Sequence, residues 1–406
     1  MRRASRLAAF AAVLGPGLLA GLSDDDPAGI TTYSILGADY GYQLLWVLVL
    51  ATLALVLFHE LGARMGIATG QGLIGLVRER YGVRWGAVAL AALLLANAGT
   101  MCAEFAGVAA ALGLAGVSRY VSVPLAVAGV SLLVLRGGLK RVEHVLLTLS
   151  AVFAAYLIAG VLAHPDWSAA AEGLVVPSMP LTRDALLIVV ATVGTTLAPW
   201  GLAFIQSYAV DKRLTLADLR LERVDVIIGA VLTGVIGAFI VIACAATLHR
   251  SGTSIESATD AAQALEPLAG SLASALFATG LLGAALLAAS VLPLSTAYSV
   301  CEAVGAEAAL DDSWRDARLF YVSFGAMTGI AALIVLLPGA PLIPILFLTQ
   351  ALNAVLLLPL LWFIHGIARD RGLMGDAVLG RAGSAATAVV IALISISVAM
   401  LLGLSL

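Results

Sequence analysis

The stretch Ser23-Asp24-Asp25-Asp26-Pro27-Ala28-Gly29 interrupts an apolar run that extends from about residue 7 to residue 38. Without the acids, this run would be one long membrane-spanning helix, and charge at that depth is costly and usually functional. Asp26 is a favourable N-cap, and Pro27 suits the first helical position, where a missing N–H costs nothing. We therefore predict two half-helices, the first ending near Leu22 and the second starting at Pro27. Such breaks present carbonyls and carboxylates to one point, as discontinuous helices do at cation sites in transporters.

A secretory signal peptide, formed by Arg2, Arg3 and the apolar run after them, is the alternative explanation of this N-terminal segment. No clear small-x-small cleavage site precedes Ser23, and the apolar pattern resumes at Ile30. Both features favour the broken helix.

The composition predicts an integral membrane protein. The chain has 406 residues, of which 61% are hydrophobic and 12% charged, and apolar runs of spanning length recur throughout. There is no basic patch or Gly-rich phosphate loop, so we expect no nucleic-acid partner. Cys102, Cys244 and Cys301 all fall in apolar runs, which argues against a disulfide framework and favours a role as small core residues.

The apolar runs predict about eleven transmembrane helices in an all-α protein. The sixth run carries its own break at Ala198-Pro199-Trp200-Gly201. The predicted spans are 7–38, 42–64, 85–113, 120–135, 142–163, 184–209, 224–248, 271–304, 317–337, 341–368 and 384–405.

The charge distribution predicts the orientation. If the N-terminus is cytoplasmic, all of the 22 Lys and Arg residues except Arg119, Arg183 and Arg250 lie on the inner side. Positive charge favours the cytoplasmic face, so the asymmetry supports the orientation and the odd number of spans. We expect a multi-pass protein of the plasma (inner) membrane with its C-terminus outside.

The two breaks suggest an internal repeat within one transporter domain, 1–406. Pro27 and Pro199 lie in the first helix of each half if the halves are residues 7–163 and 184–368, with 384–405 as an additional helix. Five spans is an odd number, so the second half inserts in the opposite sense. Interrupted helices at matching positions of inverted repeats indicate a substrate site near the midplane.

Several motifs together resemble the NRAMP family of divalent-metal transporters. The resemblance covers residues 15–82 as sequence and most of the chain as topology, and it implies a LeuT-type fold. The motifs are Gly15-Pro16-Gly17, Asp26-Pro27-Ala28-Gly29, Tyr40-Gly41-Tyr42, Leu44-Leu45-Trp46, the segment 63–70 (ARMGIATG), Arg80-Tyr81-Gly82 and Leu197-Ala198-Pro199.

In that family the first broken helix carries Asp-Pro-Gly-Asn and the sixth carries Met-Pro-His. The Asp, Asn and Met side chains bind the metal together with a carbonyl of the sixth helix. Here Asp26 takes the place of the family Asp, and the carbonyl falls on Thr195. The resemblance also shows departures, because Gly29 replaces the Asn and Ala198 replaces the Met.

These departures favour a hard cation. Ala198 removes a soft thioether ligand, and Gly29 removes an amide oxygen and opens space. Mg²⁺ prefers oxygen ligands and gives up its water reluctantly, so a roomier, acidic site suits a partly hydrated ion that Asp24 and Asp25 contact through water. The pattern resembles the NRAMP-related magnesium transporters, which carry Mg²⁺ and Mn²⁺. We expect these ions as substrates, with no resident cofactor.

The resemblance also bears on proton coupling. The family's proton path uses the sixth-helix His and a third-helix Asp, whose places are taken here by Trp200 and Met101, while Glu104 is kept. We therefore expect uncoupled entry. The membrane potential supplies about 2.3 kcal/mol per charge for each 100 mV.

Each candidate residue has a simpler interpretation. Asp26 could be only an N-cap, and Asp24 and Asp25 could be solvated in a funnel. Glu104 could line water without carrying protons. Gln350 and Asn353 could contact the hydrated ion or only bridge helices. His59 and Glu60, like Glu143 and His144, lack metal-ligand spacing, which favours structural roles.

Two other functions remain open. One is a proton-coupled Mn²⁺ or Fe²⁺ importer of the ordinary NRAMP type, against which the missing Met, Asn and His count. The other is a Na⁺-coupled amino-acid transporter of the same architecture, which three adjacent acids disfavour because they repel a carboxylate substrate. We find no nucleophile–base pair and therefore expect no enzyme activity. The sequence does not predict an oligomeric state.

Overall fold

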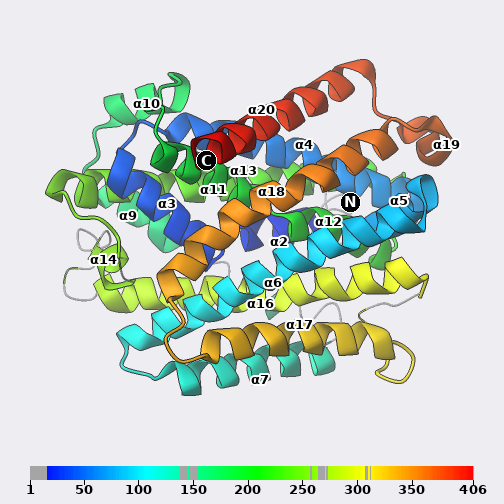
Figure 1. Ribbon diagram of the computed structural model, residues 1–406, viewed down its shortest axis with the longest axis horizontal. Helices are drawn as coiled ribbons and strands as arrows, with labels where there is room; N and C mark the ends of the chain where they lie inside the picture. The colour runs from blue at the N-terminus through cyan, green and yellow to red at the C-terminus, as the bar shows by residue number, and fades with distance from the viewer. Residues whose placement is uncertain are drawn as a thin grey trace, which may run out of the picture.

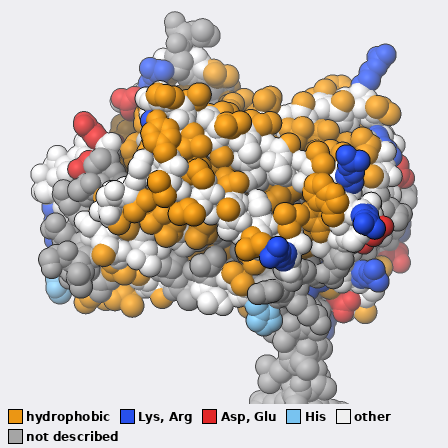
Figure 2. Space-filling model, turned by 90° about the horizontal axis from the view of Figure 1, so that it is seen from below, with side chains coloured by type: hydrophobic (Ala, Val, Ile, Leu, Met, Phe, Trp, Pro, Cys, Tyr) orange, Lys and Arg blue, Asp and Glu red, His pale blue; other side chains and the backbone are white. Residues whose placement is uncertain are grey.

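A computed structural model describes residues 16–137, 144–145, 148, 153–256, 258–263, 270, 273–306, 310 and 312–405. Within these ranges the regular structure is entirely helical, and long helices run side by side along the long axis of the molecule (Figure 1). Figure 2 shows hydrophobic side chains over much of one face, with Lys and Arg mainly toward one end. This is the distribution expected of a protein embedded in lipid.

Two spans are broken at their predicted positions. The first consists of α2 (Pro16–Ser23) and α3 (Pro27–Tyr40), and the sixth of α11 (Arg183–Thr196) and α12 (Pro199–Asp211). The remaining long helices are α4 (Leu45–Thr69), α6 (Val83–Leu114), α7 (Arg119–Gly137), α13 (Leu219–Cys244) extended by the π-helical turn η2 (Ala245–His249), α16 (Ala273–Val304), α17 (Arg318–Leu336), α18 (Leu342–Ala368) and α20 (Arg381–Ser405).

The helices match the predicted spans closely. Within the described residues, nine helices are long and apolar enough to cross a membrane, with α11 and α12 taken as one. The broken first span adds to these, as does α9 (Ala154–Leu162), the described part of the predicted fifth span. Much of 142–153 lies outside the described residues. The sequence did not predict the short helices α5 (Leu73–Tyr81), α10 (Trp167–Val175), α14 (Ala258–Gln263), α19 (Arg371–Met374) and η4 (Gly375–Ala377).

The packing between the two halves is reciprocal. The first broken helix packs against α13, the second helix of the second half, and the sixth packs against α4, the second helix of the first half. The third helices of the halves, α6 and α16, also pack against each other. A pseudo-two-fold relation between repeats produces this exchange of partners. The repeat boundaries 7–163 and 184–368 themselves remain a prediction.

Residues predicted to share a side of the membrane lie together. At one end, Arg80 pairs with Asp370 at 2.5 Å, and Arg223 pairs with Glu60 at 2.6 Å. Arg80, Arg223 and Asp370 come from three connections that were predicted to lie inside, and Glu60 lies near the predicted inner end of the second span. At the other end, the Trp46 indole N–H donates to the Ser178 carbonyl at 3.1 Å. The odd number of spans is therefore consistent with the contacts at both ends.

A backbone contact fixes the sixth span beside the tenth. A Cβ placed on Gly194 of α11 would lie 1.9 Å from the carbonyl oxygen of Gln350 and 2.7 Å from the amide nitrogen of Ala354, both on α18. Small residues permit this approach between membrane helices. The contact sets the position of Thr195, the next residue along α11.

We expect Gly194→Ala to destabilise the protein, because overlap with a packed backbone costs about 1–3 kcal/mol or more. Gly329→Ala on α17 is the matched control, since a Cβ there meets nothing within 4 Å. Thermal unfolding in detergent should show a lower midpoint for Gly194→Ala and an unchanged or slightly raised one for Gly329→Ala. Equal midpoints would contradict this account of the crossing.

Candidate cation site at the two helix breaks

The first break has the predicted cap geometry. Asp26 has an extended backbone, and its Oδ1 accepts a hydrogen bond from the Gly29 amide at 2.6 Å. Pro27 occupies the first position of α3. The preceding half-helix ends where the Asp24 amide donates to the Gly21 carbonyl at 3.0 Å. The predicted half-helix boundaries at Leu22 and Pro27 are thus confirmed to within one residue.

The second break exposes backbone carbonyls. The Leu197 amide donates to the Val193 carbonyl at 2.9 Å, and α12 restarts at Pro199, which has no N–H. The carbonyls of residues 194–196 therefore lie beyond the last backbone hydrogen bond of α11, as at any helix C-terminus. The Tyr33 hydroxyl and Thr196 Oγ1 lie 2.9 Å apart and connect the half-helices α3 and α11.

Oxygen atoms from both breaks meet at Gly29. A Cβ placed there would lie 2.9 Å from the Asp24 carbonyl oxygen, 3.2 Å from Thr195 Oγ1 and 3.3 Å from Asp26 Oδ1. We expected Gly29 to open space. In this conformation, however, three oxygens from both broken helices fill the space that a side chain would need. The absence of a side chain at residue 29 thus brings the oxygens together.

Four carboxyl groups are enclosed at this point. Asp24, Asp25, Asp26 and Glu104 are 1%, 0%, 3% and 0% exposed, so the site is closed to water on both sides. Among the described residues, the carboxyl oxygens of Asp24 and Asp25 have no hydrogen-bond partner. No Lys or Arg is fully buried anywhere in the described ranges. The protein therefore supplies no fixed cation to balance these acids.

Packing of α6 places Glu104 at the first break. A Cβ on Gly107 would lie 2.4 Å from the Pro27 ring, and Ala103 and Ala106 cluster with Ala28. This contact brings the Glu104 carboxyl beside that of Asp26. The Asp25 carboxyl lies within electrostatic range of the Tyr33 and Tyr156 side chains.

The acids do not form a ready-made cage. Across the described parts of the chain, no three or more His, Cys, Asp or Glu side chains are arranged to hold an ion. An ion at the break would therefore take most of its ligands from carbonyl, hydroxyl and water oxygens. This is compatible with the predicted set of Asp26, the Thr195 carbonyl and water-mediated contacts.

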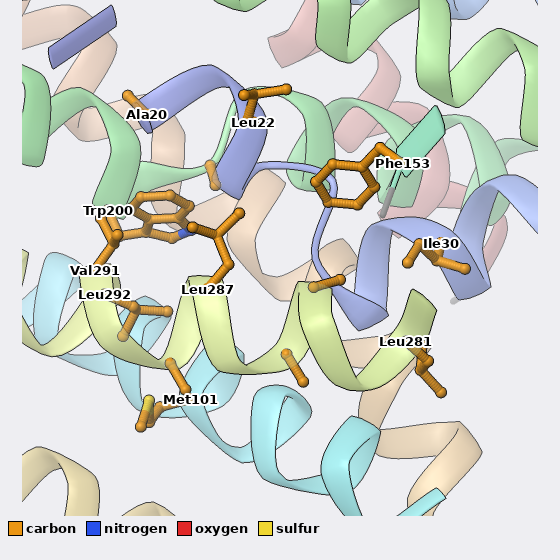
Figure 3. Close-up of a cluster of buried hydrophobic side chains, with 14 of the residues drawn as sticks. Ala20, Leu22, Ile30, Met101, Phe153, Trp200, Leu281, Leu287, Val291 and Leu292 are labelled. Carbon is orange, nitrogen blue, oxygen red and sulfur yellow. The ribbon is translucent and has the colours of Figure 1, made fainter. Parts of the chain in front are cut away.

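The side chains of Ala198 and Trp200, on either side of Pro199, lie in a hydrophobic cluster. Ala198 is 2% exposed and contributes no polar side-chain atom. Trp200 is fully buried, and Figure 3 shows it facing Leu287 and Val291 of α16, close to Ala20 and Leu22 of α2. Met101, which takes the place of an acid of the family, lies in the same cluster. No titratable group replaces the missing His and Asp at these positions.

Gln350 and Asn353 of α18 belong to one hydrogen-bonded cluster beside α6. The Asn353 amide donates to Thr100 Oγ1 at 2.8 Å and to Gln350 Oε1 at 2.9 Å. Gln350 in turn donates to Thr349 Oγ1 at 3.1 Å. Thr100 lies one turn before Glu104 on α6, so this polar cluster borders the acids. Asn353 therefore links α18 to α6, whereas the hydrogen bonds of Gln350 stay within α18.

The end of the molecule at α5 and the C-terminal part of α12, predicted to be the inner one, is closed by a separate set of hydrogen bonds. Gln206 of α12 donates to the Gln71 carbonyl at 2.9 Å, and Ser207 donates to Glu302 Oε1 at 2.5 Å. Glu302 also accepts from the Ile74 amide at 3.1 Å, in the first turn of α5. Next to these hydrogen bonds lies a pocket of about 560 Å³, lined in part by Ser207, Asp211 and Glu302.

One residue at the site was given a structural role in the sequence interpretation. His59 of α4 is fully buried, and its Nε2 lies 3.9 Å from Asp24 Oδ2. Sequence spacing does not show this proximity, because the two residues lie on different helices. The three cysteines, in contrast, are buried and free as predicted.

The fold and the enclosed acids define a multi-pass membrane transporter with a site at two interrupted helices. Residues 17–403 match the family model described as "Natural resistance-associated macrophage protein-like" (Nramp). The chain belongs to this family, which confirms the resemblance noted in the sequence, and it is a transporter rather than an enzyme.

Curated relatives agree with this assignment. The chain is 34% identical over 394 residues to "Divalent metal cation transporter MntH 1" of Pseudomonas aeruginosa, covering 92% of this chain and 87% of that protein. It is 33% identical over 298 residues to "Divalent metal cation transporter MntH" of Burkholderia ambifaria, covering 69% of this chain and 66%, just under two thirds, of that protein.

Solved structures show the same architecture. The manganese transporter of Eremococcus coleocola superposes with a TM-score of 0.78 at 19% identity, over 98% of this chain and 86% of that one. Mhp1, a nucleobase-cation-symport-1 family transporter, gives 0.59 at 15% identity, over 96% of this chain and 90% of that one. At these identities the likeness concerns the fold alone, and it supports the predicted LeuT-type fold.

The cap and the ligand roles of Asp26 can be separated. Asn caps a helix about as well as Asp, so Asp26→Asn keeps the cap and removes the charge. We expect this variant to unfold near the wild-type temperature but to bind Mg²⁺ and Mn²⁺ at least about tenfold more weakly in calorimetry. Asp39→Asn, at the exposed end of α3, is the control. Wild-type affinity in Asp26→Asn would leave Asp26 with only its capping role.

Proposed function

We propose that this protein carries divalent metal cations across the membrane by alternating access. We further propose that its preferred substrate is partly hydrated Mg²⁺, with Mn²⁺ also accepted, and that entry is not coupled to protons. The observation that carries this proposal is the set of four enclosed carboxyl groups, beside oxygens of both helix breaks, with no buried Lys or Arg in the described ranges.

The charge of the site favours a cation. Burying a carboxylate without a partner costs several kcal/mol, and a second nearby carboxylate raises that cost. A bound divalent ion offsets it, whereas an anionic or zwitterionic substrate presents its own carboxylate to the acids. The Na⁺-coupled amino-acid alternative depended on architecture alone, and the family assignment counts against it.

The ligand chemistry favours Mg²⁺. The atoms at Gly29 are a carbonyl, a hydroxyl and a carboxylate oxygen, and Ala198 offers no thioether. Hard cations prefer such oxygen ligands, and Mg²⁺ usually keeps several waters when proteins bind it. Asp24 and Asp25, whose carboxyl oxygens lack partners within the described structure, are suited to accept hydrogen bonds from those waters.

The surroundings of Trp200 and Met101 favour uncoupled entry. Both residues are fully buried in an apolar cluster at positions where a proton path would need titratable groups. A divalent ion moving inward is driven by about 2.3 kcal/mol per charge for each 100 mV, without any proton. We place the N-terminus in the cytoplasm and the C-terminus outside, in the plasma (inner) membrane.

A proton-coupled manganese importer is the second candidate. The relatives named MntH and the manganese transporter of similar fold favour it. The retained Glu104 beside Asp26 is compatible with it.

Uptake into proteoliposomes with a pH dye inside distinguishes the two candidates. We expect saturable Mg²⁺ entry at a negative inside potential, unchanged internal pH, and loss of entry in Asp26→Asn but not in Asp39→Asn. Entry of Mn²⁺ alone, accompanied by internal acidification, would favour the proton-coupled importer and show that our interpretation of Ala198 and Trp200 is wrong.

Restoring a thioether should shift the preference toward softer ions. In Ala198→Met we expect Mn²⁺ and Cd²⁺ uptake to increase relative to Mg²⁺ by about tenfold, because sulfur ligands select transition metals over hard ions. Ala198→Leu adds similar bulk without sulfur and is the control. An equal shift in both variants would mean that volume, not the ligand atom, sets the preference.

A further inference from the structure

His59 and Asp24 face each other in a closed part of the protein. His59 lies on α4, Asp24 follows α2, and neither side chain is exposed at all. His59 Nε2 and Asp24 Oδ2 are 3.9 Å apart, beyond hydrogen-bonding distance. Within the described ranges, both ring nitrogens and both carboxylate oxygens lack hydrogen-bond partners. Two buried groups are thus turned toward each other with no bond between them.

Gly201 of the neighbouring helix α12 has no side chain, and this leaves room for the His59 and Asp24 side chains. A Cβ placed on Gly201 of α12 would lie 3.2 Å from His59 Nε2 and 3.3 Å from Asp24 Oδ1. Farther along the same two helices, Gly62 of α4 meets Ile205 and Gly66 meets Gln206. The two helices therefore run in parallel, with His59 level with the first turn of α12.

This position is on the inner side of the break. Along α12, Pro199 marks the break, Gly201 lies level with His59, and Ser207 and Asp211 line the inner pocket. Six residues separate Gly201 from Ser207, which corresponds to about 9 Å of helix. The His59–Asp24 pair thus lies between the site at Asp26 and the pocket.

The separation of the two groups fits a bridging ion. Two metal–ligand bonds of about 2.0–2.2 Å place their donor atoms between about 3 Å apart, when the bonds meet at a right angle, and about 4.2 Å apart, when they are collinear. A gap of 3.9 Å is too long for a hydrogen bond and lies within that range. Water and backbone carbonyls can complete the shell of such an ion.

We propose that His59 and Asp24 form a second cation-binding position on the transport path, and that the imidazole makes this position favour transition-metal ions over Mg²⁺. The inference deepens the proposed function and depends on it. Imidazole is a better ligand for first-row transition-metal ions than for Mg²⁺, which prefers oxygen; among these ions Mn²⁺ binds nitrogen most weakly and also accepts oxygen ligands. In this arrangement the break admits hard, hydrated ions, and His59 allows Mn²⁺ to pass as well.

Competition uptake tests the role of His59. In His59→Gln, an amide replaces the imidazole. We expect the ratio of Mn²⁺ to Mg²⁺ uptake to fall about tenfold relative to wild type. An unfolding temperature in detergent close to that of wild type shows that the variant folds. The control is His365→Gln, because His365 already has a partner in Thr387 Oγ1 at 2.7 Å.

Gly201→Ala tests the same position from α12. The added methyl group would press on both His59 Nε2 and Asp24 Oδ1 without removing either ligand, so we expect a smaller fall in the same ratio. If His59→Gln and Gly201→Ala both leave the ratio unchanged, the second position is ruled out.

A spectroscopic measurement reports the ligand directly. With Mn²⁺ bound to purified protein, electron spin echo envelope modulation should show coupling to a ¹⁴N nucleus, present in His365→Gln and absent in His59→Gln. Absence of this coupling in the wild type would overturn the proposal.

The two proposals can fail separately. If Mg²⁺ enters through the Asp26 site and His59→Gln leaves both the ratio and the ¹⁴N coupling unchanged, the proposed function stands and the second position is wrong. If Mn²⁺ enters but Mg²⁺ does not, the Mg²⁺ preference is wrong, and loss of Mn²⁺ entry and ¹⁴N coupling in His59→Gln still supports the second position.

Discussion

The main physical constraint on this structure is the free-energy cost of burying carboxyl groups away from water. Asp24, Asp25, Asp26 and Glu104 lie in an interior whose other buried side chains are mostly apolar or uncharged, and the described residues offer them no buried Lys or Arg. Such a group is stable only when it is neutral, hydrogen-bonded or beside a cation. Of the three Asp residues, only Asp26 has a fixed backbone partner, the Gly29 amide. The remaining acids stay available to a mobile ion, which a transport site requires.

Helix crossings bring the two breaks together. Gly107 lets α6 approach Pro27, and Gly194 lets α11 touch the backbone of α18. The half-helix α2 is held differently: Asp225 of α13 accepts hydrogen bonds from the Gly17 and Leu18 amides at 2.8 and 3.3 Å. Opening at this end of the molecule would have to break polar contacts of this kind, including those of Gln206 and Ser207. Polar contacts exchange for water more readily than packed apolar faces do, so they suit a surface that must part and close again.

The sequence alone was enough to predict the broken helices, their caps, the spans and the family. These features depend on local rules: Pro27 and Pro199 start half-helices because of their own chemistry, and a run of apolar residues predicts a span. Contacts between distant helices could not be predicted. The closeness of His59 to Asp24 and the crowding of oxygens around Gly29 arise from how α4, α11 and α12 pack. One sequence taken by itself carries no signal for that packing.

A path for ions works best when no single position binds too tightly. Binding must be strong enough to draw an ion out of water and weak enough to release it on the other side. The site at Asp26 would combine one strong carboxylate with neutral oxygens and water, and the position at His59 would add one imidazole and one carboxylate farther inward. Neither forms a complete protein cage, in agreement with the lack of any such cluster within the described ranges. Two modest positions in series let the inner one take up an ion as the outer one releases it. The protein would then need no proton to release a tightly bound ion.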